Sequence, residues 1–241
     1  MSTILSNRVQ KVKPSATMAV SDKAKELKSQ GIQIISMGSG EPDFDTPVNI
    51  QKAAITAIGS GDTRYTPADG TAELKKAVCE KFKRENGLDY SLNEVMVSCG
   101  GKQVFYNLCQ AILNEGDEVI IPTPYWVSYP DMVKLCGAIP VPVVPENGTF
   151  TPTLQDIKQN VSSYTKAIII NSPNNPSGAI YPKSFIKDIV EFAEEKGIYL
   201  IMDDIYQKLV FDGETVPNPF DYVKDFTDNS KLVIINGVSK A

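Results

Sequence analysis

The feature that most constrains this chain is a regular alternation of short apolar runs and amphipathic stretches between residues 94 and 236. Short apolar runs predict strands, and stretches with apolar residues three and four apart predict helices. The predicted strands are 94–98, 118–122, 138–144, 166–171, 198–204 and 231–236. The predicted helices between them are 102–113, 128–135, one opened by a capping box at Thr153 and Asp156, and 183–196.

Such alternation indicates an α/β fold with a mainly parallel sheet that helices cover on both faces. Ligands of these sheets collect beyond the carboxyl ends of the strands, so the residues just after each strand are the candidates for chemistry. Before residue 94 the pattern predicts helices over 15–31, 49–58 and 72–86. Thr46 and Pro47 signal the start of the second helix, and Gly87 ends the third.

The overall charge gives no reason to expect a nucleic-acid or membrane partner. The 241 residues carry 24 Lys and Arg against 29 Asp and Glu, a net charge of -5, so a bound phosphate would need a local site. The chain contains no run of roughly 18 apolar residues, which is the length that a membrane span needs. The N-terminal residues lack the apolar core and cleavage pattern of a signal peptide. We therefore expect a cytoplasmic protein.

Histidine and cysteine usage excludes several kinds of site. The chain contains no histidine, which excludes Ser-His-Asp and Cys-His nucleophile systems and histidine-rich metal sites. Cys79, Cys99, Cys109 and Cys136 form no Cys-x-x-Cys pair, so we interpret them as reduced structural thiols and expect no metal. Acid–base chemistry must then use Lys, Asp, Glu, Tyr or a cofactor.

Groups suited to a bound ligand follow the earlier predicted strands. Gly100, Gly101 and Lys102 open a helix directly, where glycines let the backbone approach an anion at the helix N-terminus. A tight strand-to-helix turn explains them equally well. Trp126, the only tryptophan, either stacks on a flat ring or fills core.

Polar residues also follow the later strands. Asn175 lies in a segment rich in Asn, Pro and Ser, which by itself is typical of a turn. Asp203 and Asp204 end an apolar strand, where a carboxylate either needs a positive partner or caps a helix, and Tyr206 follows them. Lys240 follows the last strand, where a lone lysine is ordinarily a solvated surface charge.

Together and in this order, these segments resemble the fold-type I aminotransferases, specifically the bacterial aspartate aminotransferase subfamily of the class I and II aminotransferases. The resemblance covers essentially the whole chain and rests on GEPDFDTP, RYTPADG, GGKQVFYNL, GDEVIIPTPYWVSYPDMV, NSPNNPSGA, DDIYQKL and INGVSKA. It implies a three-layer α/β/α large domain of the PLP-dependent transferase type over residues 46–241. Residues 1–45 would then form an N-terminal arm and part of a small domain.

The resemblance implies pyridoxal 5'-phosphate as cofactor, bound as a Schiff base on Lys240, whose freed amine then moves the substrate proton. Asp203 matches the carboxylate that faces the pyridine nitrogen and keeps it protonated. Asn175 and Tyr206 match the groups that hydrogen-bond the phenolic oxygen of the ring, and Trp126 matches the aromatic that stacks on it. Lys240, Asp203 and Tyr206 are the implied catalytic residues.

The resemblance also implies which residues contact the phosphate of the cofactor. Gly100, Gly101 and Lys102 match the loop whose N–H groups meet the phosphate at the helix start. Tyr65 matches a tyrosine that reaches the phosphate of the neighbouring subunit, which implies a homodimer with shared active sites.

The implied substrate contacts are Gly40, Trp126, Asn175, Lys102 and Thr17. Lys102 and Thr17 match positions that recognise acidic substrates in this subfamily. A surface lysine and a helix-capping threonine are the alternative interpretations of these two residues.

The chain departs from the family pattern in two ways. Gly237 stands where some members carry a hydroxyl that bonds the phosphate, and glycine offers no side chain. The family also continues well beyond the lysine, so we expect this chain to lack a C-terminal portion. That portion holds an arginine for the phosphate and the arginine that pairs with the substrate carboxylate.

We therefore expect an aminotransferase that moves the amino group of aspartate to 2-oxoglutarate. A prephenate or aromatic aminotransferase and a Cβ–S lyase are alternatives on the same fold, and a truncated, non-catalytic cofactor-binding fragment is an alternative of another class. A dehydrogenase that binds its nucleotide at Gly38 and Gly40 is weakly supported, because proline and acidic residues follow where a phosphate-binding helix should begin.

Overall fold

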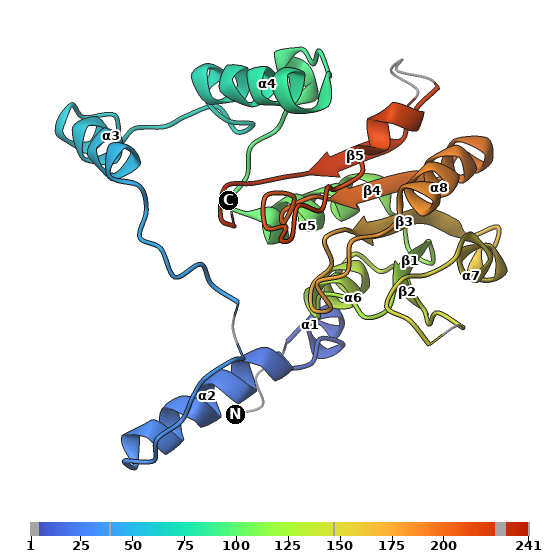
Figure 1. The fold of residues 1–241 in the computed structure, drawn as a ribbon, viewed down its shortest axis with the longest axis horizontal. Helices are drawn as coiled ribbons and strands as arrows, with labels where there is room; N and C mark the ends of the chain where they lie inside the picture. Colours follow the sequence, from blue (N-terminus) through green and yellow to red (C-terminus); the bar gives the residue numbers. More distant parts are fainter. Residues whose placement is uncertain (1–4, 39, 147, 225–229, 241) are drawn as a thin grey trace. The chain divides into compact units, whose positions relative to one another are not determined.

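The computed structural model describes residues 5–38, 40–146, 148–224 and 230–240 (Figure 1). The chain divides into two compact units, which we call the sheet unit (Met1–Ser36 and Cys99–Ala241) and the helical unit (Met37–Ser98). The predicted domain division between residues 45 and 46 stays a prediction.

The sheet unit is built on a five-stranded parallel sheet. Its strands are β1 (Glu118–Pro122), β2 (Ile139–Val143), β3 (Thr165–Asn171), β4 (Tyr199–Asp203) and β5 (Leu232–Ile235). They lie in the order β2-β1-β3-β4-β5, and every neighbouring pair is parallel. Both the parallel sheet and the positions of these five strands confirm the sequence prediction.

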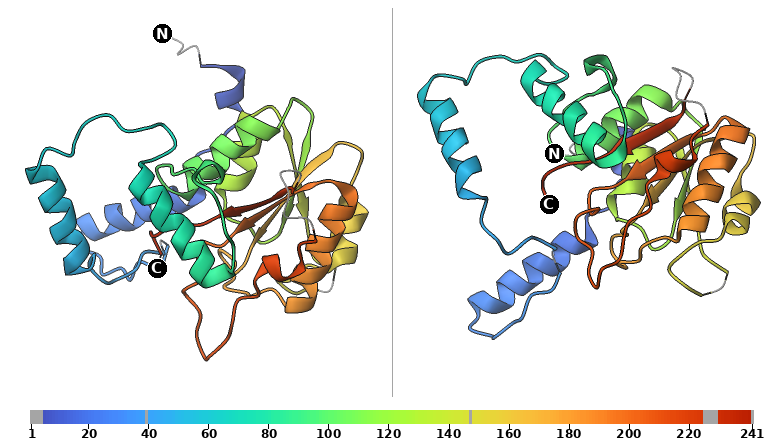
Figure 2. Two further views of the ribbon diagram at one scale, coloured as in Figure 1. Left: turned by 90° about the horizontal axis from the view of Figure 1, so that it is seen from above. Right: turned by 45° about the horizontal axis from the view of Figure 1, so that its top comes forward.

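Helices cover both faces of this sheet, as Figure 2 shows. The helical segments of the unit are α1 (Asn7–Gln10), α2 (Ala16–Ser29), α5 (Gly101–Ile112), α6 (Ser128–Leu135), α7 (Leu154–Asn160), α8 (Lys183–Lys196) and the 3-10 turn η2 (Pro219–Tyr222). At the start of α7, Thr153 Oγ1 accepts from the Asp156 N–H and Asp156 Oδ2 accepts from the Thr153 N–H. The predicted capping box is therefore confirmed.

Side chains alternate between the two faces along each central strand. In β3 and β4, Ile168 and Leu200 pack in a core with α7 and α8, whereas Ile169 and Ile201 pack in a second core with α5 and α6. Burial of both faces explains why these strands are continuously apolar rather than alternating in sequence. The result is the predicted three-layer α/β/α arrangement.

The strand order places a topological switch point between β1 and β3. From β1 the chain leads through α6 to β2, then returns through α7 past β1 to β3. As a result α6, which follows β1, and α8, which follows β3, pack on opposite faces of the sheet. Loops that leave adjacent strands toward opposite faces open a crevice at the carboxyl edge.

The helical unit contains α3 (Val48–Gly59), α4 (Ala72–Asn86) and the 3-10 turn η1 (Leu92–Glu94). The helices confirm the prediction, with Gly87 at φ 73° ending α4. The predicted strand 94–98 is wrong. No strand pairs with this segment in the described chain, and the Val97 N–H donates instead to the carbonyl of Asp69 at 3.0 Å. Pro47, rather than Thr46, occupies the N-cap position of α3.

No helix in the described ranges is long and apolar enough to cross a membrane. The four cysteines are free thiols. Cys109 lies within α5 and is buried in the core, whereas Cys99 is exposed.

In the helical unit, the backbone at Gly70 lies very close to the side chain of Val97. A Cβ atom built there would lie 2.9 Å from Val97 Cβ, and Gly70 has a φ of 105°. Beside it, Asp69 forms an ion pair with Lys75, whose side chain is buried. The loop before α4 is thus held against the segment that follows η1.

We expect Gly70→Ala to lower the free energy of unfolding by about 3 kcal/mol, because it adds overpacking against Val97 to backbone strain. Gly61→Ala is the matched control, since Gly61 also has a positive φ, 81°, but no atom within 4 Å of an added Cβ. Its expected loss is about 1 kcal/mol from strain alone. Denaturant titration measures both, and equal losses would contradict the steric explanation.

Candidate active site

The parallel register brings three strand ends together. Asn171 of β3 pairs with Asp203 of β4, and Asp203 pairs with Ile235 of β5. A cavity of about 230 Å³ opens at this carboxyl edge. The carboxyl-edge cavity is lined by Gly100, Gly101, Lys102, Trp126, Tyr129, Asn171, Asn175, Asp203, Ile205, Tyr206, Ser239 and Lys240.

Most of the predicted site residues therefore meet in one place. Gly40, Tyr65 and Thr17 are not among the lining residues. Gly40 and Tyr65 are exposed residues of the helical unit, and Thr17 is exposed in the first turn of α2. The interpretation of Thr17 as a helix cap is wrong, because Ser15 Oγ accepts from the Met18 N–H and caps α2.

Asp203 is the most deeply buried charged group of the cavity, with 6% of its surface exposed. Its Oδ2 accepts a 2.5 Å hydrogen bond from the Tyr129 hydroxyl, and its Oδ1 accepts from the Ile205 N–H at 3.2 Å. Burial raises the pKa of Asp203, and the two hydrogen bonds offset this only in part. Asp203 caps no helix and forms no ion pair within the described residues, so its carboxylate faces the cavity without a cation.

Asn175 and Tyr206 form a second polar pair. Asn175 Nδ2 donates to the Tyr206 hydroxyl oxygen at 3.1 Å. Asn171 holds this pair in place, because its Oδ1 accepts from the Asn175 N–H at 2.7 Å and its Nδ2 donates to the carbonyl of Asp203 at 2.9 Å. Burial raises the pKa of Tyr206, and the hydrogen bond from Asn175 opposes that rise.

The start of α5 supplies an anion-binding element. Gly100 is its N-cap with a φ of 85°, a conformation that favours glycine. The first N–H groups of a helix have no intrahelical acceptor, so those of Gly101 and Lys102 are available to an anion. Lys102 is exposed, but its Nζ lies 5.1 Å from the centroid of the Trp126 ring. Lys102 is therefore a surface lysine, as the alternative interpretation expected, that also contacts a ring lining the cavity.

The segment after β5 brings Ser239 and Lys240 to the cavity wall. Gly237 precedes them, and a Cβ atom there would lie 2.8 Å from Ile205 Cδ1. Ile205 thus occupies the space that a side chain at position 237 would enter. Because Cδ1 is the end of a flexible side chain, Ile205 would have to turn away to admit a side chain at 237.

Tyr129, Asn171 and Ile205 were missed by the sequence analysis as site residues. Asn171 ends its strand on the same face as Asp203, a signal that side-chain alternation could have provided. Tyr129 follows Trp126 by three residues, a spacing that places both near the same side of the helix start. Ile205 gives no such signal.

These groups fit pyridoxal phosphate. A buried carboxylate without a cation suits a protonated ring nitrogen, and a helix start with available N–H groups suits a phosphate. The Asn175–Tyr206 pair suits a phenolic oxygen, and Trp126 offers a ring face. No cluster in the described ranges has three side chains able to hold a metal ion.

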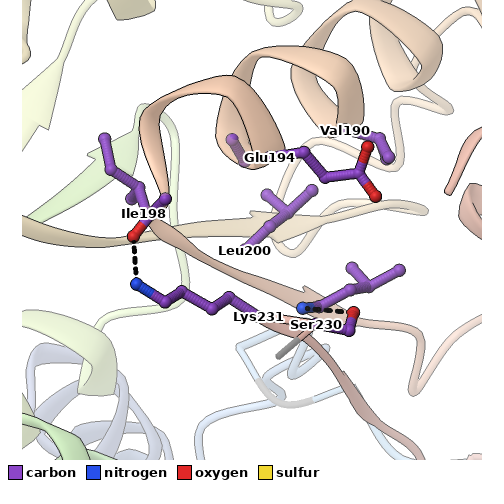
Figure 3. Close-up of a pocket in the computed structure, with 9 residues that line it drawn as sticks. Val190, Glu194, Ile198, Leu200, Ser230 and Lys231 are labelled. Carbon is purple, nitrogen blue, oxygen red and sulfur yellow. Dashed lines mark hydrogen bonds between the residues drawn. The ribbon is translucent and has the colours of Figure 1, made fainter. Parts of the chain in front are cut away.

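A second cavity, of about 160 Å³, lies at the amino-terminal ends of β4 and β5 (Figure 3). It is lined mainly by apolar side chains of α8 and these strands. Lys231 Nζ donates to the Gly197 carbonyl at 2.5 Å, which satisfies a backbone acceptor at the end of α8. Lys231 therefore has a structural role, and we assign no chemistry to this cavity.

We expect the ligand-free Asp203→Asn variant to be more stable than wild type at neutral pH. A carboxyl group whose folded pKa is raised stabilises fully below its ordinary value of 3.8 and loses that contribution as pH rises through the folded value. The difference in the free energy of unfolding, variant minus wild type, should therefore grow as pH is raised above 3.8. Denaturation at several pH values measures it, and a difference independent of pH would contradict the burial argument.

The chain is similar to known proteins in sequence and in overall structure. The model of the family "Aminotransferase class I and II" matches residues 32–241. An aspartate aminotransferase of Bacillus sp. strain YM-2 is 46% identical over 245 residues, which cover 100% of this chain and 61% of that relative. An aspartate/prephenate aminotransferase of Thermus thermophilus is 49% identical over 212 residues, which cover 87% of this chain and 55% of that relative.

Solved structures of aspartate aminotransferases are also similar to this chain. The aspartate aminotransferase from Thermus thermophilus with maleate superposes with a TM-score of 0.91 at 44% identity, covering 99% of this chain and 61% of that one. The aspartate aminotransferase from Rhizobium meliloti gives the same TM-score at 39% identity. This chain spans about three fifths of the length of these relatives. It belongs to the class I and II aminotransferases, a family of pyridoxal-phosphate-dependent enzymes.

Proposed function

We propose that the protein carrying this chain is an aminotransferase that moves the amino group of aspartate to 2-oxoglutarate, with pyridoxal phosphate held on Lys240. The observation that carries the proposal is the carboxyl-edge cavity. It joins two lysines, one buried carboxylate, a polar Asn–Tyr pair, a tryptophan and a glycine-rich helix start, contributed by residues far apart in sequence.

Each of these groups has a distinct task in the proposal. Lys240 anchors the cofactor through Nζ and, once released, takes and returns the substrate Cα proton. Asp203 keeps the ring nitrogen protonated. Asn175 and Tyr206 hydrogen-bond the phenolic oxygen, and Trp126 stacks on the ring. When bound, pyridoxal phosphate supplies an electron sink for the negative charge that proton removal leaves on the substrate.

The phosphate is proposed to lie at the start of α5, where Gly100, Gly101 and Lys102 present backbone N–H groups. Glycine at 100 and 101 leaves this approach open, since no atom lies within 4 Å of an added Cβ at Gly100 and the nearest atom at Gly101 is 3.9 Å away. This loop and the buried carboxylate would bind opposite ends of one ligand.

The proposal of an acidic substrate rests on Lys102. Its cation lies over Trp126 at the mouth of the cavity, where a second carboxylate of a dicarboxylic amino acid would meet it. The named activities of the relatives support aspartate, and some include prephenate. Prephenate is therefore the second candidate, and it also carries two carboxylates. Gly40 and Thr17 stay proposed substrate contacts.

A homodimer with shared sites is also proposed. Tyr65 is the proposed contact to the phosphate of the neighbouring subunit, and it is fully exposed in the helical unit. Ile55 and Ile58 of α3 are also more than half exposed, which supports a partner surface there. A cytoplasmic location stays part of the proposal.

We expect the purified protein to absorb visible light after incubation with pyridoxal phosphate, and borohydride to fix the cofactor covalently to Lys240. Peptide mass mapping locates the adduct. Lys240→Ala should lose both the absorbance and the adduct, whereas Lys187→Ala, at an exposed position of α8, should keep both. A protein that stays colourless, or an adduct at another lysine, would count against the proposal.

We expect the highest kcat/KM with aspartate and 2-oxoglutarate, lower activity with prephenate and none with cystathionine. Lys102→Gln should lower kcat/KM for aspartate by roughly tenfold to a hundredfold, the size of one charge-assisted contact, and affect alanine much less. Coupled assays with aspartate, alanine, prephenate and cystathionine, with 2-oxoglutarate as the acceptor for the amino donors, measure this. Equal losses for aspartate and alanine would remove Lys102 from substrate recognition.

A further inference from the structure

Tyr129 is a buried tyrosine whose ring packs against two other aromatic rings. It lies in the first turn of α6 with 2% of its surface exposed. The ring meets Phe105 of α5 edge to face, with centroids 5.1 Å apart, and meets Trp126 at 90° with centroids 5.3 Å apart. Two aromatic contacts on different sides fix where the hydroxyl points.

The hydroxyl of Tyr129 points at the carboxylate of Asp203. The two residues are 74 positions apart in sequence, and the hydrogen bond between them measures 2.5 Å. The Ile205 N–H donates to the other oxygen. A carboxylate has about four acceptor positions, so each oxygen keeps one that can face the cavity.

The hydrogen bond from Tyr129 also changes how readily Asp203 takes up a proton. A donor to a carboxylate stabilises its charged form, so Tyr129 lowers the pKa of Asp203 against the larger effect of burial. Burial raises the pKa of Tyr129 far above its ordinary range, so the phenol keeps its proton and remains a donor. Lys102, Tyr206 and Lys240 are the other ionisable side chains that line the cavity.

We propose that Tyr129 is a positioning residue that aims the carboxylate of Asp203 and keeps it the weaker base in its pair with the cofactor's ring nitrogen. The inference rests on the proposed function. The proton shared by the pair then stays on nitrogen and Asp203 stays anionic. Without the phenol, that proton moves from nitrogen to Asp203, which leaves a neutral ring and a neutral acid. Only the proton changes place, and no electron is transferred.

The test compares Tyr129→Phe with wild type and with Tyr181→Phe. Tyr181 is an equally buried tyrosine, 1% exposed, that packs in the core with α7 and α8, so the control removes the same atom elsewhere. Each protein is loaded with pyridoxal phosphate labelled with nitrogen-15, and the ring-nitrogen NMR signal is recorded. Titration of the apoprotein gives the cofactor dissociation constant.

We expect a protonated ring nitrogen in wild type and Tyr181→Phe. In Tyr129→Phe we expect the signal to move toward that of a neutral pyridine, and cofactor binding to weaken roughly tenfold, the size of one hydrogen bond to a charged group. A Tyr129→Phe signal and dissociation constant equal to wild type would overturn the inference and leave the proposed function intact. A wild-type protein that binds no pyridoxal phosphate overturns both.

Phe105→Leu provides a second variant, because it keeps the phenol but removes one of the rings that hold it. Phe105 does not line the cavity. We expect a smaller move of the nitrogen signal in the same direction. If Tyr129→Phe fails to fold, a Phe105→Leu signal identical to wild type would contradict the inference.

Discussion

Side-chain alternation along β3 and β4 is the constraint on which the site depends. Ile169 and Ile201 face the α5–α6 layer, and two residues later Asn171 and Asp203 face the same way. Asp203 therefore lines the cavity, whereas Asp204, also buried, is not among its lining residues. A slip of one residue in β4 would exchange these two positions and separate the Asp203 carboxylate from α5 and α6.

The same geometry explains how a carboxylate is tolerated inside the protein. Burial favours its neutral form, and the Tyr129 hydroxyl and the Ile205 N–H favour the charged form. Neither donor carries a charge, and Asp203 forms no ion pair in the part of the chain that the structure describes. In the proposed function, a protonated ring nitrogen of the cofactor would supply that charge, and binding would then stabilise the anionic form of Asp203.

Much of the fold could be predicted because the strands are buried on both faces and the helices carry caps. β1 and α8 have the predicted bounds, and Gly87 ends α4 as expected. The segment 94–98 was mispredicted for a physical reason. A strand needs a neighbour to satisfy its backbone, and local sequence does not reveal whether one is present.

The site was predictable in part. The sequence pattern identified which polar residues follow successive strands, but only the resemblance to the family assigned a role to each of them. Tyr129 was missed because its role depends on a contact with Asp203 that only the folded sheet creates. Gly40, Thr17 and Tyr65 stay predictions, since they are not among the residues that line the carboxyl-edge cavity.

The contact between Gly237 and Ile205 has a consequence for redesigning this site. A Cβ atom at 237 would lie 2.8 Å from Ile205 Cδ1, the end of a flexible side chain. A small side chain could therefore be introduced at 237 by a rotamer change at Ile205, with the backbone of both segments left in place.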